Sequence, residues 1–163
     1  ALIKFPEYNF SSVRPGILLY GLSPFPETQI EWSPVLSLHS YISVIKKLPK
    51  DSFVSYNRTY KTKKQTIIGI VPIGYADGIP LSLSNKGYVL YNGLRCPIIG
   101  NVCMNQFMID ITHVKSPLEG ETVTIIGKQG DNEITTLDIA SWANTIPYEI
   151  LCNLSCYIQR RIE

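Results

Sequence analysis

Tyrosine is the residue type in this sequence with the clearest capacity for acid–base chemistry. The chain has 10 tyrosines among 163 residues, and Tyr56, Tyr75 and Tyr148 stand beside glycine or in turn-like contexts. A tyrosine can act as a general base when a nearby cation or hydrogen-bond donor lowers its pKa from about 10. Most tyrosines in folded proteins instead pack their rings and leave the hydroxyl at the surface. The residues alone leave both interpretations open for each of the three.

Other common catalytic and metal-binding patterns do not occur in this sequence. Neither a G-x-S-x-G motif nor an H-E-x-x-H motif is present. The four cysteines form no C-x-x-C pair and there are two histidines, so we expect no metal site. The glycines of residues 127–131 lack the spacing of a phosphate-binding loop, and no helix follows at once, so a β-turn is the better interpretation.

Composition and charge describe a folded domain. Apolar residues make up 45% and charged residues 17%, which excludes disorder as the main state. The net charge of +2 gives no electrostatic reason to expect nucleic acid or a membrane surface as a partner. The longest apolar stretch, residues 67–76, is interrupted by two glycines and a proline and is too short to span a bilayer.

The start of the chain and its cysteines suggest a compartment. Residues 1–7 lack the basic and apolar regions of a signal peptide, and the chain does not begin with Met. We therefore expect a piece of a longer cytoplasmic polypeptide whose four cysteines are reduced and partly buried. Cys152 and Cys156 fall in a β-like run, so we expect no disulfide between them.

The elements that must position the tyrosines are predicted to be mainly β. The predicted strands are 13–21, 36–44, 66–73, Tyr88–Tyr91, Leu94–Ile99, 107–111, 122–126 and 154–158. The run at 13–21 is predicted to be buried on both faces, and Asn92-Gly93 predicts a hairpin turn. One helix is predicted over 137–145, capped by Thr135 or Thr136. Three prolines in 23–34 indicate a linker between a short first piece and the main β domain.

Five longer motifs occur along the chain in a fixed order. They are V-R-P-G-I-L-L-Y-G at 13–21, V-S-Y-N-R-T-Y at 54–60, P-I-G-Y-A-D-G at 72–78, G-N-V-C-M-N-Q at 100–106 and I-P-Y-E at 146–149. Together they closely resemble the C-terminal part of pyridoxal-phosphate-dependent alanine racemase, over residues from about 10 to 161. Because the five motifs match in order, the resemblance is far more specific than any one of them would be.

The resemblance implies a (β/α)₈ barrel followed by a mainly β C-terminal domain. Residues 1–30 would be the remnant of the end of the barrel, with 13–21 as its last strand, and 31–163 would be the C-terminal β domain. It also implies pyridoxal phosphate at the C-terminal mouth of the barrel. The implied protein is a head-to-tail homodimer in which the β domain of one subunit completes the active site of the other. The implied activity interconverts L- and D-alanine, an isomerase reaction that supplies D-alanine for bacterial cell-wall peptidoglycan.

The resemblance also implies roles for individual residues. Tyr56 would remove or return the Cα proton on one face of the substrate, while the lysine that binds the cofactor acts on the other face. Arg14 would face the pyridine nitrogen of the cofactor and keep it unprotonated. The other matched positions are the phosphate contacts Gly16, Ile17 and Tyr148, the substrate-carboxylate contact Met104, and the entry-channel residues Tyr75 and Ile146.

The sequence departs from the family pattern in ways that bear on activity. Asn101 stands where the family usually has Arg, Asn105 where it usually has Asp, and Ile79-Pro80-Leu81 where it often has Trp-x-Arg. These differences affect the entry channel and the range of substrates rather than Tyr56. The Lys-Ala-x-Ala-Tyr-Gly-like motif of the cofactor lysine is absent, so we expect the isolated chain to be inactive. The alternative is a non-catalytic β module that assembles with a separate barrel chain.

Overall fold

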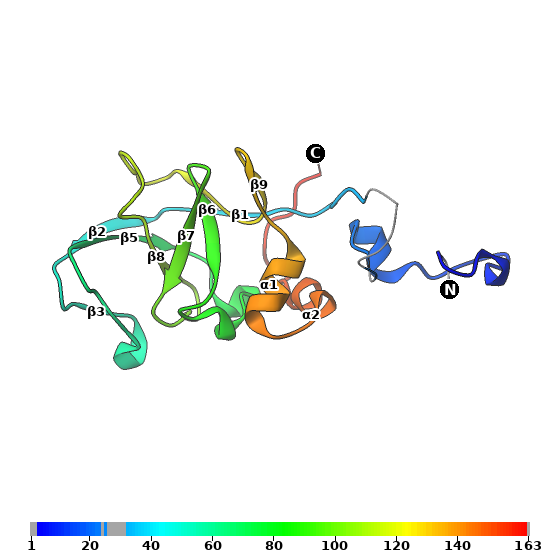
Figure 1. The fold of residues 1–163 in the computed structure, drawn as a ribbon, viewed down its shortest axis with the longest axis horizontal. Helices are drawn as coiled ribbons and strands as arrows, with labels where there is room; N and C mark the ends of the chain where they lie inside the picture. The colour runs from blue at the N-terminus through cyan, green and yellow to red at the C-terminus, as the bar shows by residue number, and fades with distance from the viewer. Residues whose placement is uncertain (1–2, 24, 26–31, 163) are drawn as a thin grey trace. The chain divides into compact units, whose positions relative to one another are not determined.

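The structure, a computed structural model, describes residues 3–23, 25 and 32–162. The chain divides into two compact units, Ala1–Leu36 and Ser37–Glu163 (Figure 1). Most of the predicted linker at 23–34 lies outside the described residues. The two units are therefore described separately.

The first unit contains two short 3₁₀ helices, η1 (Pro6–Tyr8) and η2 (Gly16–Tyr20). The predicted strand at 13–21, and with it a barrel strand in this segment, was wrong. Pro15 has no N–H for a strand ladder, and Gly16 at φ +61° turns the chain away from an extended path. Gly21 ends η2 in the left-handed region and donates its N–H to the carbonyls of Ile17 and Leu18. The glycines that bound the apolar run therefore form turns instead of ending a strand.

The second unit is built on one large antiparallel sheet, in the strand order β1-β9-β6-β7-β8-β5-β2, with β10 paired to β9. The strands are β1 (Leu38–Tyr41), β2 (Val44–Leu48), β5 (Thr66–Val71), β6 (Tyr88–Tyr91), β7 (Leu94–Ile99), β8 (Phe107–Asp110), β9 (Thr122–Gln129) and β10 (Asn132–Ile134). A separate pair, β3 (Phe53–Val54) with β4 (Tyr60–Lys61), leaves the sheet between β2 and β5 (Figure 1). The mainly β fold is confirmed.

The two ends of the large sheet meet at a two-residue connection. β1 and β2 are the end strands, yet only Ile42 and Ser43 separate them in sequence. The Ile42 N–H donates to the Glu121 carbonyl at 2.9 Å, and the Ser43 N–H donates to the Ile70 carbonyl at 2.8 Å. The sheet therefore curls into a barrel-like layer, and Ile42 is fully buried inside it. The break at these residues explains why one predicted strand at 36–44 is two strands in the structure.

Two helices and three further short 3₁₀ turns complete the second unit. The turns are η3 (Tyr56–Arg58), η4 (Tyr75–Asp77) and η5 (Leu81–Leu83). The predicted helix is confirmed as α1 (Thr136–Ala143), where the Thr135 hydroxyl accepts from the Asp138 N–H and Asp138 bonds back to the Thr135 N–H.

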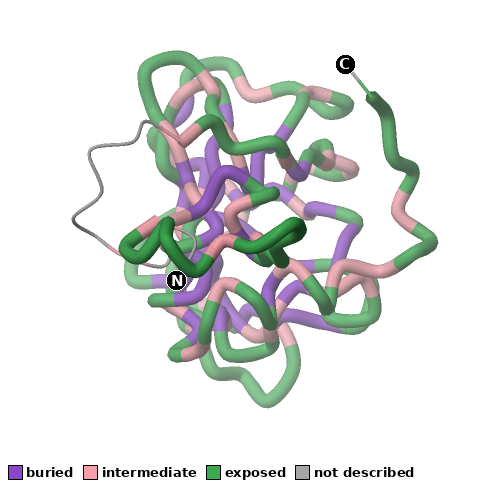
Figure 2. Tube along the Cα trace, turned by 90° about the vertical axis from the view of Figure 1, so that its right-hand side faces the viewer, coloured by how far each residue is buried: buried purple, intermediate pink, exposed green. Residues whose placement is uncertain are grey.

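The predicted closing strand at 154–158 was wrong. The second helix, α2 (Pro147–Asn153), ends at this point, and the chain after it runs through turns that leave it largely exposed (Figure 2). Pro147 is favoured in the first turn of a helix because it has no N–H to satisfy.

A buried tyrosine fixes the loop before β9 to the hairpin of β6 and β7. Tyr91 is fully buried, and its hydroxyl bonds to the Glu121 carboxylate and accepts from the Leu118 N–H at 2.9 Å. The hydrogen bond from Tyr91 is the main cause that lowers the pKa of the Glu121 carboxyl below its ordinary value. Burial, more than this bond, raises the pKa of Tyr91 to about 12.

These shifts predict how stability depends on pH. The folded state lowers the pKa of Glu121, so this carboxylate stabilises the fold above its unfolded pKa of about 4.3, and the stabilisation disappears as pH falls through the lower folded-state pKa. We expect Glu121→Gln to flatten the acid limb of a plot of unfolding free energy against pH. Glu133→Gln, which removes a carboxylate from β10, is the control for the loss of one negative charge. An unchanged acid limb in Glu121→Gln would contradict the role of this bond.

Candidate functional site

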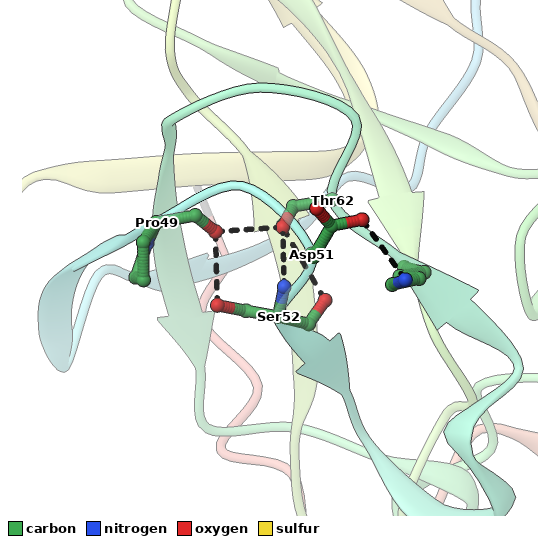
Figure 3. Close-up of polar contacts among 5 residues, drawn as sticks. Pro49, Asp51, Ser52 and Thr62 are labelled. Carbon is green, nitrogen blue, oxygen red and sulfur yellow. Dashed lines mark hydrogen bonds and ion pairs between the residues drawn. The ribbon is translucent and has the colours of Figure 1, made fainter.

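Tyr56 lies at the tip of an arm that is closed at its base by a buried threonine. The arm runs from β3 through η3 to β4. Thr62, 1% exposed, donates its hydroxyl to the Pro49 carbonyl at 2.8 Å and accepts from the Ser52 N–H at 2.9 Å (Figure 3). An ion pair of 2.9 Å between Lys61 and Asp51 flanks these bonds. The base of the arm is therefore fixed, while the Tyr56 side chain is 71% exposed.

The backbone around Tyr56 has an uncommon conformation. Ser55, Asn57 and Arg58 have φ values of +66°, +59° and +52°, a region that residues other than glycine rarely occupy. The Ser55 hydroxyl donates to the Asn101 carbonyl at 2.7 Å. The Asn101 side-chain amide donates to the Tyr56 carbonyl at 3.2 Å. The loop at 100–104 therefore holds the tip of the arm in this conformation.

The same loop is bonded to the turn that carries Tyr75. The N–H of Tyr75 donates to the Cys103 carbonyl at 3.0 Å, and the N–H of Ala76 donates to the Met104 carbonyl at 2.9 Å. Gly74 makes this approach possible, since a Cβ at Gly74 would lie 2.2 Å from the Cys103 carbonyl oxygen. Tyr75 and Met104 are about half exposed, at 50% and 54%. The structure thus brings the loops of Tyr56, Met104 and Tyr75 into one hydrogen-bonded set.

Helix α2 and its C-terminal end pack against the Tyr75 turn. The Ser155 N–H donates to the Asp77 carbonyl at 3.1 Å. Gly78, at φ +100°, leaves no room for a Cβ, which would lie 2.2 Å from the Asn153 carbonyl oxygen. Tyr148 is in the first turn of this helix and, like the preceding Ile146, is exposed. The helix that carries Tyr148 is therefore attached to the same group of loops.

A small apolar cluster lies beneath the arm and the loop at 100–104. Its buried members are Val54, Ile68, Ile99, Cys103 and Met108. Val54 belongs to β3 of the arm, Cys103 to the loop, and the others to β5, β7 and β8. The sheet therefore supports both segments from below.

The three candidate cofactor residues of the first unit lie at or beside η2. Arg14 and Gly16 are exposed, and Ile17 is buried. Gly16 has φ +61°, and a Cβ built on it would meet nothing within 4 Å. The start of η2 is therefore open around the backbone of Gly16.

The residues that depart from the family pattern differ in their exposure and contacts. Leu81 and Asn105 are exposed, whereas Asn101 is half-buried and bonded to the arm.

Sequence reasoning missed Thr59, Thr62 and Asn85, which hold the arm. The one available signal was the position of Thr59 inside the motif at 54–60.

The cysteines divide into two buried and two exposed thiols. All four cysteines are free; Cys96 and Cys103 are buried, whereas Cys152 and Cys156 are exposed, and Cys152 lies in α2 instead of a strand. Burial, with a smaller contribution from Asp110, raises the pKa of the Cys96 thiol to about 12, which suppresses the reactive thiolate.

Within the described residues, no group of three or more His, Cys, Asp or Glu side chains could hold a metal ion. None of the helices described is long and apolar enough to cross a membrane.

Comparison with known proteins gives consistent matches. Residues 35–162 match the family model described as alanine racemase, C-terminal domain. The curated alanine racemase of Halothermothrix orenii is 43% identical over 162 residues, covering 98% of this chain and 43% of that protein. The crystal structure of alanine racemase from Bacillus anthracis with bound L-Ala-P has a TM-score of 0.81 at 43% identity, over 86% of this chain and 36% of that chain.

A third match carries a cofactor. The crystal structure of alanine racemase from Bartonella henselae with covalently bound pyridoxal phosphate has a TM-score of 0.80 at 32% identity, over 86% of this chain and 38% of that chain. The chain spans less than half the length of each of these three relatives.

Proposed function

This chain belongs to the alanine racemase family through its C-terminal domain, and we propose that it is the C-terminal portion of an enzyme that interconverts L- and D-alanine with Tyr56 as one of two bases. The observation that carries this assignment is the arm. The Tyr56 side chain is exposed at its tip, while hydrogen bonds to the loop of Met104 hold the backbone on either side. A side chain open to substrate on a fixed backbone is what proton transfer between positioned groups requires.

Racemisation requires a proton to leave Cα on one face and a proton to arrive on the other. In one direction the Tyr56 phenolate oxygen takes the Cα proton, so that an O–H bond forms as the C–H bond breaks. The group on the opposite face, which is protonated at the start of this direction, then delivers its proton to Cα from that side. In the reverse direction the Tyr56 hydroxyl is the donor. The family resemblance assigns the opposite base to the cofactor lysine, for which this chain has no matching motif.

The residues of the first unit suit pyridoxal phosphate, which when bound would supply the sink for the electron pair of the broken Cα–H bond. Arg14 carries a permanent cation and is exposed, so we assign it to the pyridine nitrogen. The open backbone at Gly16 leaves room for an anion beside the first N–H groups of η2. We assign the amides of Gly16 and Ile17 to the phosphate. In the second unit, the exposed Tyr148 hydroxyl is assigned to the phosphate as a further donor.

The remaining assignments concern the substrate. We assign the Met104 N–H to the alanine carboxylate, and Tyr75 and Ile146 to the entry channel, where all three side chains are exposed. Asn101, Asn105 and Leu81 replace two arginines and an acid of the family pattern. These changes alter the charges of the entry, so they bear on entry kinetics and on which amino acids beside alanine are accepted.

The assembly and setting follow from the family. We propose a head-to-tail homodimer in which the Tyr56 arm serves the active site of the partner, residues 1–30 end a (β/α)₈ barrel, and residues 31–163 form the β domain. The exposure of the Tyr56, Tyr75 and Met104 side chains agrees with surfaces that such an assembly would cover. The product D-alanine would serve cell-wall peptidoglycan synthesis in the cytoplasm.

The test is racemisation by this chain with added pyridoxal phosphate, alone and together with a barrel-bearing alanine racemase segment. We expect no conversion of L- or D-alanine by the 163-residue chain alone, because it has no lysine in the cofactor-binding motif. Activity should appear only when the barrel is supplied. Racemisation by the chain alone would contradict the expected inactivity of the isolated chain and would rule out the alternative of a non-catalytic module. An inactive mixture in which the two parts bind would favour the module.

A further inference from the structure

We propose that Asn101, together with Thr59 and Asn85, is the positioning residue that fixes Tyr56 for proton transfer. The assignment rests on the proposed function, because it concerns the base named there. The Asn101 side chain does not reach the substrate in this role. It acts on the backbone of the arm.

The three side chains form a ring of hydrogen bonds that closes through the backbone of Gly100 and Asn101. The Asn85 amide donates to the Thr59 hydroxyl at 3.1 Å, and that hydroxyl donates to the Asn101 side-chain oxygen at 3.0 Å. The N–H of Gly100, the residue before Asn101, donates to the Asn85 side-chain oxygen at 2.7 Å. The Asn101 amide is left to donate to the Tyr56 carbonyl. One asparagine thus connects the ring to the residue that carries the base.

The conformation of the arm explains why such a ring is needed. Ser55, Asn57 and Arg58 have positive φ values, and such backbone relaxes unless its surroundings hold it. Thr62 closes the base of the arm, on the far side of β3 and β4 from the tip. Hydrogen bonds from Ser55 and Thr59 to Asn101, from Asn85 to Thr59 and from Asn101 to the Tyr56 carbonyl join the tip of the arm to neighbouring segments. They restrain the backbone that carries the Tyr56 ring.

The choice of asparagine is specific to this ring. Its side chain has one acceptor and two donor hydrogens, so it can accept from Thr59 and donate to Tyr56 at the same time. Arginine, which the family pattern usually has here, donates only and cannot accept the Thr59 proton. Aspartate accepts only and cannot donate to the Tyr56 carbonyl. The Thr59–Asn101 bond is therefore a feature of this chain that the family pattern does not contain.

The test uses the full-length enzyme that contains this chain, with the variant Asn101→Ala. We expect kcat to fall by about 10- to 100-fold, as for a displaced catalytic group. Alanine deuterated at Cα supplies the readout that a purely structural role would not move. The substrate isotope effect should rise in the direction in which Tyr56 removes the proton, and fall in the opposite direction. Asn132→Ala is the matched control, since it removes an exposed 2.8 Å amide-to-carbonyl bond to Gly93, far along the sheet.

A second variant keeps the test valid if Asn101→Ala folds poorly. Thr59→Val keeps the shape of the exposed Thr59 side chain and removes the acceptor and donor between the two asparagines. It should shift both isotope effects in the same sense as Asn101→Ala, by a smaller amount. Wild-type kcat in both variants would overturn the positioning role. A lower kcat with unchanged isotope effects would also overturn it, because that result indicates only a smaller fraction of folded enzyme. Tyr56→Phe distinguishes failure of the positioning role from failure of the proposed function. If the proposed function is wrong, Tyr56→Phe keeps wild-type activity.

Discussion

Replacing Tyr56 with Phe in the full-length protein that contains this chain is expected to reduce alanine racemisation by about 10²- to 10⁴-fold, the contribution of a general acid–base group. The change removes one oxygen atom and keeps the ring. Because the Tyr56 side chain is 71% exposed, its loss removes no core packing. The measurement is kcat for L- and D-alanine with purified Tyr56→Phe and wild-type enzymes. The overall equilibrium is fixed by the substrates, so kcat/KM must fall equally in the two directions.

The matched control for this variant is Tyr88→Phe. Tyr88 is partly exposed on β6, and its ring contacts Trp142 edge-on at 5.5 Å between centroids, a contact that Phe retains. We expect wild-type racemisation and an unchanged unfolding midpoint. If Tyr56→Phe were as active as Tyr88→Phe, Tyr56 would be a surface tyrosine with no catalytic role. That result would remove the central assignment of this chain.

The second large effect is expected from Gly74→Ala, which we predict destabilises the second unit by about 3 kcal/mol, the upper part of the range for overpacking. A Cβ at this position would lie 2.2 Å from the Cys103 carbonyl oxygen and 2.4 Å from that of Met104. Both contacts are backbone atoms that accept hydrogen bonds from the Tyr75 turn, so they cannot rotate away. Urea denaturation followed by circular dichroism measures the loss.

Gly120→Ala separates this clash from the ordinary cost of replacing a glycine. Gly120 has φ +86° and nothing within 4 Å of its Cβ position, so only backbone strain applies, which costs about 1 kcal/mol. Gly74 itself has an extended backbone that any residue can adopt, so its cost comes from the contact alone. Equal destabilisation by the two variants would mean that the Tyr75 turn and the Met104 loop separate easily. They would then not hold a common site.

Local patterns predicted the elements whose formation depends on near neighbours in sequence. Asn92-Gly93 predicted the hairpin of β6 and β7, and a cap at Thr135 or Thr136 predicted the start of α1, where the structure has Thr135 as the cap. The residues of 13–21 and 154–158 are as apolar as true strands. Pro15 and Gly16 turn the first segment away from an extended path, and the second follows helix α2 without pairing to a strand. An apolar run alone does not show whether a strand partner exists.

The candidate site was predictable only in part, for a physical reason. Tyr56, Tyr75 and Met104 could be named from the motifs, but their loops meet through backbone carbonyls that carry no sequence signal. The ring of Asn85, Thr59 and Asn101 joins residues up to 42 positions apart. Such a juxtaposition depends on the curl of the whole sheet, which no local spacing reports.

The most direct test of the account is exchange of the Cα hydrogen with D₂O in the Tyr56→Phe enzyme, started separately from L-alanine and D-alanine. The variant keeps the base on the opposite face, so one enantiomer should exchange its Cα hydrogen for deuterium while keeping its configuration. The other enantiomer should not exchange, and racemisation should be lost. Exchange from both enantiomers at wild-type rates, or equal loss of exchange from both, would contradict the role of Tyr56 as the base of one face.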